Sequence, residues 1–186
     1  MGALTQTDYD RLHDYLCDVI LEEQIKLGYE KETIRFYSPS ASIANILHLT
    51  DKSSKAVIQA LEPFCAYVSD TLGDMEISKC SGERICFLIP AKGAEYVHEN
   101  WEKNPFLEEL IACFLKHGIT LEDVRSVFEK WSDTAECIHI GSDEFDDVLY
   151  FADGKPDAYR YCVKFDAGHA FYHRFIEEDY EDLLKA

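Results

Sequence analysis

The chain has 186 residues, 47% hydrophobic and 13% aromatic, a composition that argues against disorder and supplies a core for one domain or two small ones. Its 36 acidic and 18 basic side chains give a formal net charge of −18, which opposes general binding to a polyanion such as DNA. No apolar run approaches the ~20 residues of a membrane-spanning helix, so we expect no membrane association.

The N-terminal part of the chain predicts two helices separated by a short strand. Apolar residues recur at helical spacing from a candidate N-cap at Thr7 to a natural stop at Gly28. Alternation in Thr33–Ser38, which runs into a proline, predicts a strand. Ser40 is a candidate cap for the short helix that follows this strand.

A further helix and a hairpin complete this half. The helix begins near Ser53, and we expect it to kink or split at Pro63. Met75–Pro90 reads as two strands around a Ser-Gly-Glu-Arg turn, with apolar residues on both faces of Arg84–Ile89, which predicts burial of both faces. The order resembles the winged-helix fold, and the resemblance implies that Thr33–Ser38 pairs with the hairpin.

The second half predicts two capped helices, a meander and a final helix. Asn104 precedes a proline at the first helical position, and Thr120 opens a capping box. Four strand-like runs separated by turn residues predict an antiparallel meander, and an acidic helix closes the chain. We therefore expect an α+β protein with a winged-helix-like domain over 1–103 and an acidic helix-plus-meander domain over 104–186. No low-complexity linker separates the halves, so packing as one body stays open.

Three segments carry a closer resemblance. They are "EEQIKLGYEKETIRFYSPSAS", "NPFLEELI" and "YHRFIEEDYEDLL". They resemble a protein family of Gram-positive anaerobes, and this family is known only as domain of unknown function 3877. The resemblance spans nearly the whole chain and supports the fold unit, but it implies no activity, cofactor or catalytic residue.

A winged helix raises the question of DNA binding. The candidate nucleic-acid contacts lie at the start of the helix predicted to begin near Ser53 and on the hairpin. They are Lys52, Ser53, Ser54, Lys55, Lys79 and Arg84. Glutamates interleave with these few cations, at Glu62, Glu76 and Glu83. Contacts between basic side chains and phosphates normally supply much of the affinity for DNA, and this surface offers few basic side chains. We therefore favour a winged helix that is used for protein contact.

Candidate metal ligands occur in the meander: Cys137, His139, Cys162, His169 and His173. His169 and His173 would lie about 13 Å apart along a strand, too far for one ion, and no standard zinc spacing is present. The acidic run 143–147 lacks the calcium-loop pattern and reads as a solvated turn. We therefore expect no metal, no cofactor and no stoichiometric zinc in the purified protein.

The functional prediction is a non-catalytic module that works through protein contacts. The seven cysteines form no CxxC pair and the N-terminus lacks a signal peptide, which predicts reduced thiols in the cytoplasm. No GxGxxG, P-loop, HExxH or GxSxG pattern occurs, although a pocket holding a paired cysteine and histidine would favour an enzyme. The alternative is a DNA-binding transcription regulator whose C-terminal half dimerises or senses a ligand. The protein partner is unidentified, and a homodimer is a further option.

Overall fold

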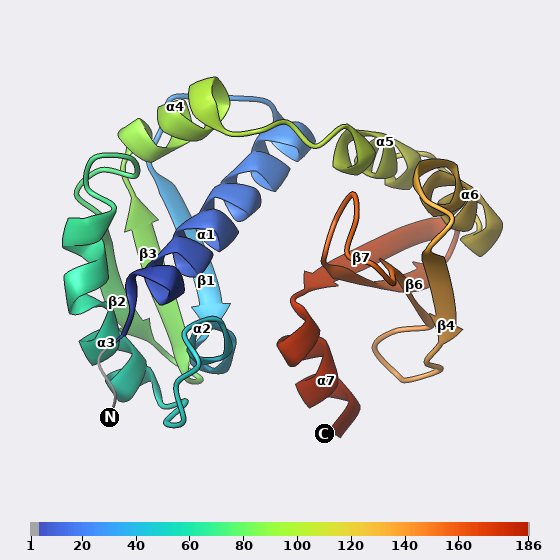
Figure 1. Cartoon of the computed structure of the whole chain (residues 1–186). Coiled ribbons are helices and arrows are strands. Elements are labelled where there is room, and N and C mark those ends of the chain that lie inside the picture. Colours follow the sequence, from blue (N-terminus) through green and yellow to red (C-terminus); the bar gives the residue numbers. More distant parts are fainter. Residues whose placement is uncertain (1–3, 186) are drawn as a thin grey trace. The chain divides into compact units, whose positions relative to one another are not determined.

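A computed structural model describes residues 4–185 (Figure 1). The described chain is α+β, as predicted, with seven helices, a three-stranded antiparallel sheet and a four-stranded antiparallel meander. It divides into two compact units, with the boundary between Lys103 and Asn104. None of the described helices is both long enough and apolar enough to cross a bilayer.

The first unit contains four helices and the three-stranded sheet. Its elements are α1 Gln6–Leu27, β1 Ile34–Pro39, α2 Ser40–Ile46, α3 Ser54–Tyr67, β2 Glu76–Cys80, β3 Arg84–Ile89 and α4 Ala91–Asn100. The strand order is β1-β3-β2. The predicted pairing of the early strand with the hairpin is confirmed, since Ile34 lies opposite Ile89 and Pro39 lies opposite Arg84.

The central strand β3 anchors the core of this unit. Ile85, Phe87 and Ile89 share one face and are fully buried, and α3 and α4 pack against the strand. On the opposite face Cys86 is buried, whereas Leu88 is only half-buried. Burial of both faces is therefore confirmed for most of β3, with Leu88 the more accessible position.

Two predicted caps are wrong by a few residues. The cap of α1 is Thr5 and not Thr7, because the Thr5 hydroxyl accepts from the Asp8 N–H while the Asp8 carboxylate accepts from the Thr5 N–H at 2.8 Å. Ser40 is the first residue of α2 and does not cap it. Its hydroxyl instead donates to the Lys52 carbonyl oxygen at 2.7 Å, which ties α2 to the segment before α3.

Helix α4 is absent from the sequence prediction, and α3 does not split at Pro63, one of the two outcomes expected there. Gly93 lies in α4, and a Cβ there would come within 2.5 Å of the Ile89 side chain, so the glycine permits close approach of helix and sheet. A glycine so near the helix start obscures the helical pattern in the sequence. Helix α3 continues through Pro63, whose exposed position leaves the backbone carbonyl that loses its partner within reach of water.

The second unit contains the meander and three helices. Its elements are α5 Pro105–Phe114, α6 Leu121–Trp131, β4 Ala135–His139, β5 Asp147–Phe151, β6 Arg160–Asp166, β7 His169–Phe175 and α7 Glu177–Lys185. The strand order is β4-β5-β6-β7, so the predicted meander is confirmed. The predicted caps are also confirmed, since Asn104 accepts from the Leu107 N–H and Thr120 forms a capping box with Asp123.

Helices cover both faces of the meander. On one face, Phe106 of α5 lies at the centre of an aromatic cluster, with ring centroids 5.0 Å from Phe128, 4.9 Å from Phe151 and 5.9 Å from Tyr161. On the other face, α7 packs against a small cluster that includes Cys162. The fully buried aromatic residues of this half, Phe106, Phe128, Phe151 and Tyr161, therefore belong to the core.

We predict that Phe106→Ala lowers the free energy of unfolding by about 3–5 kcal/mol, because the change leaves a cavity in the aromatic cluster. Phe171→Ala is the matched control, since Phe171 is 61% exposed and its loss should cost ~0.5 kcal/mol or less. Urea unfolding followed by circular dichroism measures both values. Equal destabilisation by the two changes would contradict the position of Phe106 in the core.

Candidate functional site

The hairpin tip of the first unit turns back toward the helices. Cys80 lies opposite Arg84, so three residues, numbers 81–83, form the loop. Gly82 and Glu83 have φ values of +69° and +52°, in the left-handed region that a residue other than glycine rarely adopts. This turn directs both the backbone and the side chain of Glu83 toward the starts of α2 and α3.

Glu83 contacts three parts of the first unit. Its backbone carbonyl accepts a hydrogen bond from the N–H of Ser40, the first residue of α2, at 2.9 Å. Its carboxylate accepts one from the N–H of Ser54, the first residue of α3, at 2.8 Å, and one from Lys79 at 3.1 Å. The first N–H groups of a helix have no partner within the helix, and one loop residue here supplies a partner for two helices.

These contacts favour the charged form of the Glu83 carboxylate. The Ser54 N–H, then the Ser54 hydroxyl and then the Lys79 ammonium lower the pKa of Glu83 to about 2. The Ser54 hydroxyl is fully buried beside this carboxylate, but among the described residues it has no partner in regular hydrogen-bond geometry. The positive end of α3 is therefore occupied by an anion that belongs to the chain itself.

The six candidate nucleic-acid contacts do not form one exposed cationic surface. Ser54 is fully buried, so its side chain is not part of the exposed surface at the start of α3. Ser53 accepts from the Ala56 N–H as the N-cap of α3, which uses its hydroxyl locally.

The cations among the six differ in their surroundings. Lys52 and Lys55 are exposed near the start of α3. Lys79 is paired with Glu83, and the guanidinium of Arg84 lies 5.9 Å from the centre of the Tyr37 ring. Beyond Lys55, α3 has no further basic residue, and its exposed side carries the acidic Glu62.

The five candidate metal ligands are split between the two faces of the meander. Cys162 lies opposite His173 on the face that α7 covers. Cys137 lies opposite Leu149, on the face that α6 covers, and His139 shares that face. In the described part of the chain, no three histidine, cysteine or carboxylate side chains come together as a metal site.

His139, His169 and the acidic run 143–147 make contacts with other side chains of the second unit. The His139 ring contacts the buried carboxylate of Asp147 at 3.0 Å, and the His169 ring lies edge-on to His117 with centroids 5.0 Å apart. Asp146, from the acidic run, accepts from Lys164 at 2.8 Å and from the Phe165 N–H at 2.8 Å. Part of the run predicted as a solvated turn thus has a structural role.

A cysteine–histidine pair that the sequence analysis missed lies on α1. The Cys17 sulfur is 3.7 Å from Nε2 of His13, one turn away on the helix, and Thr71 lies 3.1 Å from the same nitrogen. Cys17 is fully buried, and burial followed by the nearby Asp18 and Asp14 raises the pKa of its thiol. A nucleophilic cysteine needs the opposite, an accessible sulfur and a lowered pKa, so this pair functions in packing.

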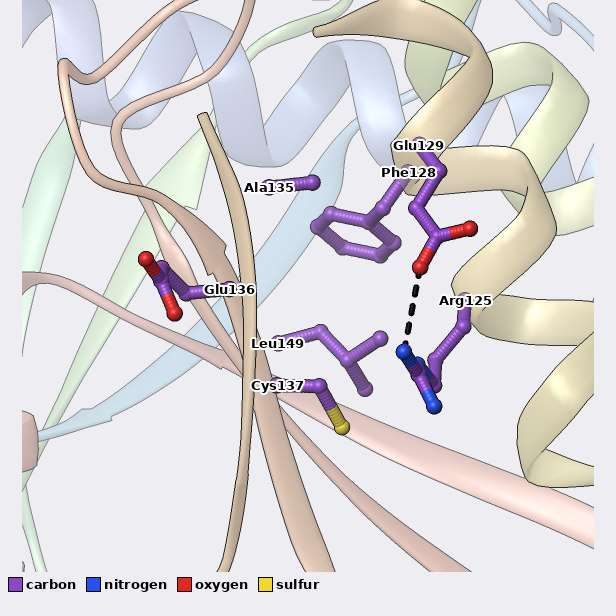
Figure 2. Close-up of a pocket in the computed structure, with 7 residues that line it drawn as sticks. All are labelled: Arg125, Phe128, Glu129, Ala135, Glu136, Cys137 and Leu149. Atoms are coloured by element: carbon purple, nitrogen blue, oxygen red, sulfur yellow. Dashed lines mark hydrogen bonds and ion pairs between the residues drawn. The ribbon is translucent and has the colours of Figure 1, made fainter. Parts of the chain in front are cut away.

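A small depression lies between α6 and the strands β4 and β5. Its lining comprises Arg125, Phe128, Glu129, Ala135, Glu136, Cys137 and Leu149 (Figure 2). Its volume of about 20 Å³ admits a single water but no cofactor. Arg125 bridges to Glu129 at 3.1 Å beside the apolar side chains of the lining.

Comparison with known proteins gives a family but no activity. The family model described as "Domain of unknown function, E. rectale Gene description (DUF3877)" matches residues 9–184, and the chain belongs to this family. The match covers nearly all of both units and confirms the resemblance noted in the sequence. No curated protein and no solved structure matches the chain.

We predict that Glu83→Gln destabilises the protein at neutral pH and that this difference disappears in acid. The folded pKa of about 2 lies below the ordinary value of 4.5, so the carboxylate stabilises the fold above pH 4.5, and this contribution is lost as the pH falls toward 2. Thermal unfolding between pH 7 and pH 2 measures the effect. Glu76→Gln, on the same hairpin, controls for the loss of one negative charge. A gap between wild type and Glu83→Gln that stays constant with pH would contradict the role of the charge.

Proposed function

We propose that this member of the DUF3877 family is a non-catalytic regulatory or protein-interaction module of the cytoplasm, in which the first unit uses a winged-helix scaffold for protein contact. The element order of the first unit and the pairing of β1 with the β2–β3 hairpin support the winged-helix assignment. In this reading α3 takes the place of the recognition helix and the hairpin is the wing.

The observation that carries this proposal is the contact between Glu83 and α3. A helix N-terminus is a ready site for a phosphate, because its free N–H groups and its dipole favour negative charge. Here the Glu83 carboxylate accepts from the Ser54 N–H at 2.8 Å, and the buried Ser54 hydroxyl lies beside it. A phosphate at this position would have to displace an internal carboxylate, which argues for a partner other than DNA.

The charge of the first unit supports the same conclusion. Residues 1–103 carry ten basic and seventeen acidic side chains, a net charge of −7. Lys79, one of the cations on the hairpin, is paired with Glu83 at 3.1 Å. Few cations are then available to release counterions from DNA, and such release supplies most of non-specific affinity.

A DNA-binding transcription regulator, whose C-terminal half dimerises or senses a ligand, is the second candidate. The exposed side chains of Lys52 and Lys55 favour it, because they flank the start of α3, where phosphate contacts of a winged helix would lie. These two lysines make the alternative testable by charge reversal.

We predict no binding of the protein to random duplex DNA at physiological salt, up to a protein concentration of about 100 μM, which lies within the range of ordinary non-specific binding. Fluorescence anisotropy of a labelled duplex measures this, and titrations at lower salt extend the range. The double variant Lys52→Glu with Lys55→Glu is the comparison.

Micromolar binding that weakens steeply with salt and is lost in the double variant would overturn the proposal in favour of the second candidate. Weak binding at low salt that is the same in wild type and double variant would agree with it, since the start of α3 would then have no part in the contact.

A further inference from the structure

We propose that the outer edge of β4 binds a basic, extended polypeptide segment by strand addition. This inference rests on the proposed function as a protein-interaction module and names the surface and the chemistry of the partner. It concerns the second unit alone, whereas the DNA argument concerns the first.

Strand β4 presents unpaired backbone groups along its outer side. It lies at one edge of the meander, and among the strands of residues 4–185 it pairs with β5 alone. The even-numbered residues face β5, as shown by the bonds from the Ile140 N–H to the Asp146 carbonyl at 2.8 Å and from the Ala152 N–H to the Thr134 carbonyl at 2.9 Å. Alternation then directs the N–H and C=O of Cys137 and His139 away from β5, toward the open edge.

This edge lacks lysine and proline, two of the features that commonly block strand addition, and its charged residue is the acidic Glu136. Proteins protect exposed edges with lysine or other charged residues and with proline. The other edge strands of the two described sheets have such residues: Arg35 and Pro39 in β1, Lys79 in β2, and Arg174 in β7. Strand β4, Ala135–His139, contains no lysine, arginine or proline, and Ile138 near its end is 47% exposed.

The depression described above lies directly beside this edge. Cys137 and Ala135 of β4 contribute to its lining together with Phe128 of α6, and Figure 2 shows Glu136 pointing to the opposite side of the strand. A strand added to β4 would place alternate side chains next to this depression and the others next to Ile138. One face of the added strand thus meets a lining that includes Phe128 and Glu129, and the other meets Ile138 and Glu136, so apolar and acidic side chains lie on both sides.

The charges around the edge of β4 determine which sign of charge a bound segment should carry. Asp147, Glu129 and Glu122 all lie close enough to raise the pKa of the Cys137 thiol, after the larger effect of burial, whereas Arg125 lowers it. Arg125 is already shared between Glu129 at 3.1 Å and Glu122 at 3.6 Å. The edge is therefore acidic.

The second unit as a whole also carries a negative net charge. Residues 104–186 carry eight basic and nineteen acidic side chains, a net charge of −11. Lysine or arginine side chains on the added strand would complement this field. Pairing of β4 with β4 of a second copy would instead bring two sets of the same carboxylates together, so a basic segment is the favoured occupant.

Three labelled ten-residue peptides test the inference on the full-length protein by fluorescence anisotropy. The probe alternates valine and lysine, the charge control alternates valine and glutamate, and the backbone control is the valine–lysine peptide with alternate amides N-methylated. We expect the probe to bind at least about tenfold more tightly than either control, because one control loses charge complementarity and the other loses main-chain hydrogen bonds.

Two variants test the position of the site. Cys137→Pro removes the outward N–H but no bond to β5, and proline is tolerated at such edge positions. Cys137→Ala is the matched control, since it shortens the side chain and keeps the N–H. We expect the proline variant to bind the probe about tenfold more weakly and the alanine variant to stay within about twofold of wild type. Unfolding curves of both variants verify that they are folded.

Equal binding of the probe and its N-methylated form, or equal binding by the two variants, would overturn the inference. Self-association of the protein through this edge would also overturn the inference. It would appear as concentration-dependent oligomers of the wild-type protein that are absent in Cys137→Pro. If the proline variant does not fold, the binding of the probe and of its N-methylated form to the wild-type protein still tests the inference. The DNA measurements do not involve β4, so failure here leaves the proposal for the first unit to be judged on its own.

Discussion

One residue, Glu83, holds the hairpin of the first unit against the starts of two helices, with its backbone carbonyl at α2 and its carboxylate at α3. The residue stands next to β3, the strand at the centre of the sheet, and its backbone and side chain satisfy the first N–H of α2 and of α3. The left-handed turn at Gly82 and Glu83 makes both contacts possible at once. The position of the hairpin and the electrostatics of the α3 N-terminus therefore depend on the same residue, and so does the argument about what this unit binds.

The two units treat their exposed backbone groups differently. In the first, the hairpin tip caps helix ends that would otherwise attract anions, and its edge strands carry charge or proline. In the second, aromatic packing around Phe106 secures a core on one face of the meander and α7 covers part of the other. The edge at β4 keeps outward N–H and C=O groups beside a surface that is apolar and acidic. This contrast is the reason that the proposed strand addition is assigned to the second unit.

Several side chains of types that often take part in chemistry have structural roles in the fold. Cys17 and His13 form a contact of the kind found in cysteine enzymes, yet burial raises the pKa of the Cys17 thiol and removes it from solvent. Cys137 and Cys162 lie on opposite faces of one sheet, which separates the candidate metal ligands. Residue types in a pattern indicate a site only when the fold brings their reactive atoms to one accessible place.

The α+β class, the β2–β3 hairpin, the meander and the helix starts at Ser53, Asn104 and Thr120 follow from the sequence, because capping, turn chemistry and hydrophobic periodicity act between residues close in the chain. The pairing of β1 with β3 joins distant residues, and only the resemblance to the winged-helix fold implied it. Only the tertiary structure decided that Ser54 is buried and that Gly93 lies in a helix pressed against β3. It also decided the contact of Glu83 with Ser54, since these residues are 29 positions apart and meet only when the hairpin packs on α3. In the sequence Glu83 is one acid among many, and its role follows from where the folded backbone directs its carboxylate.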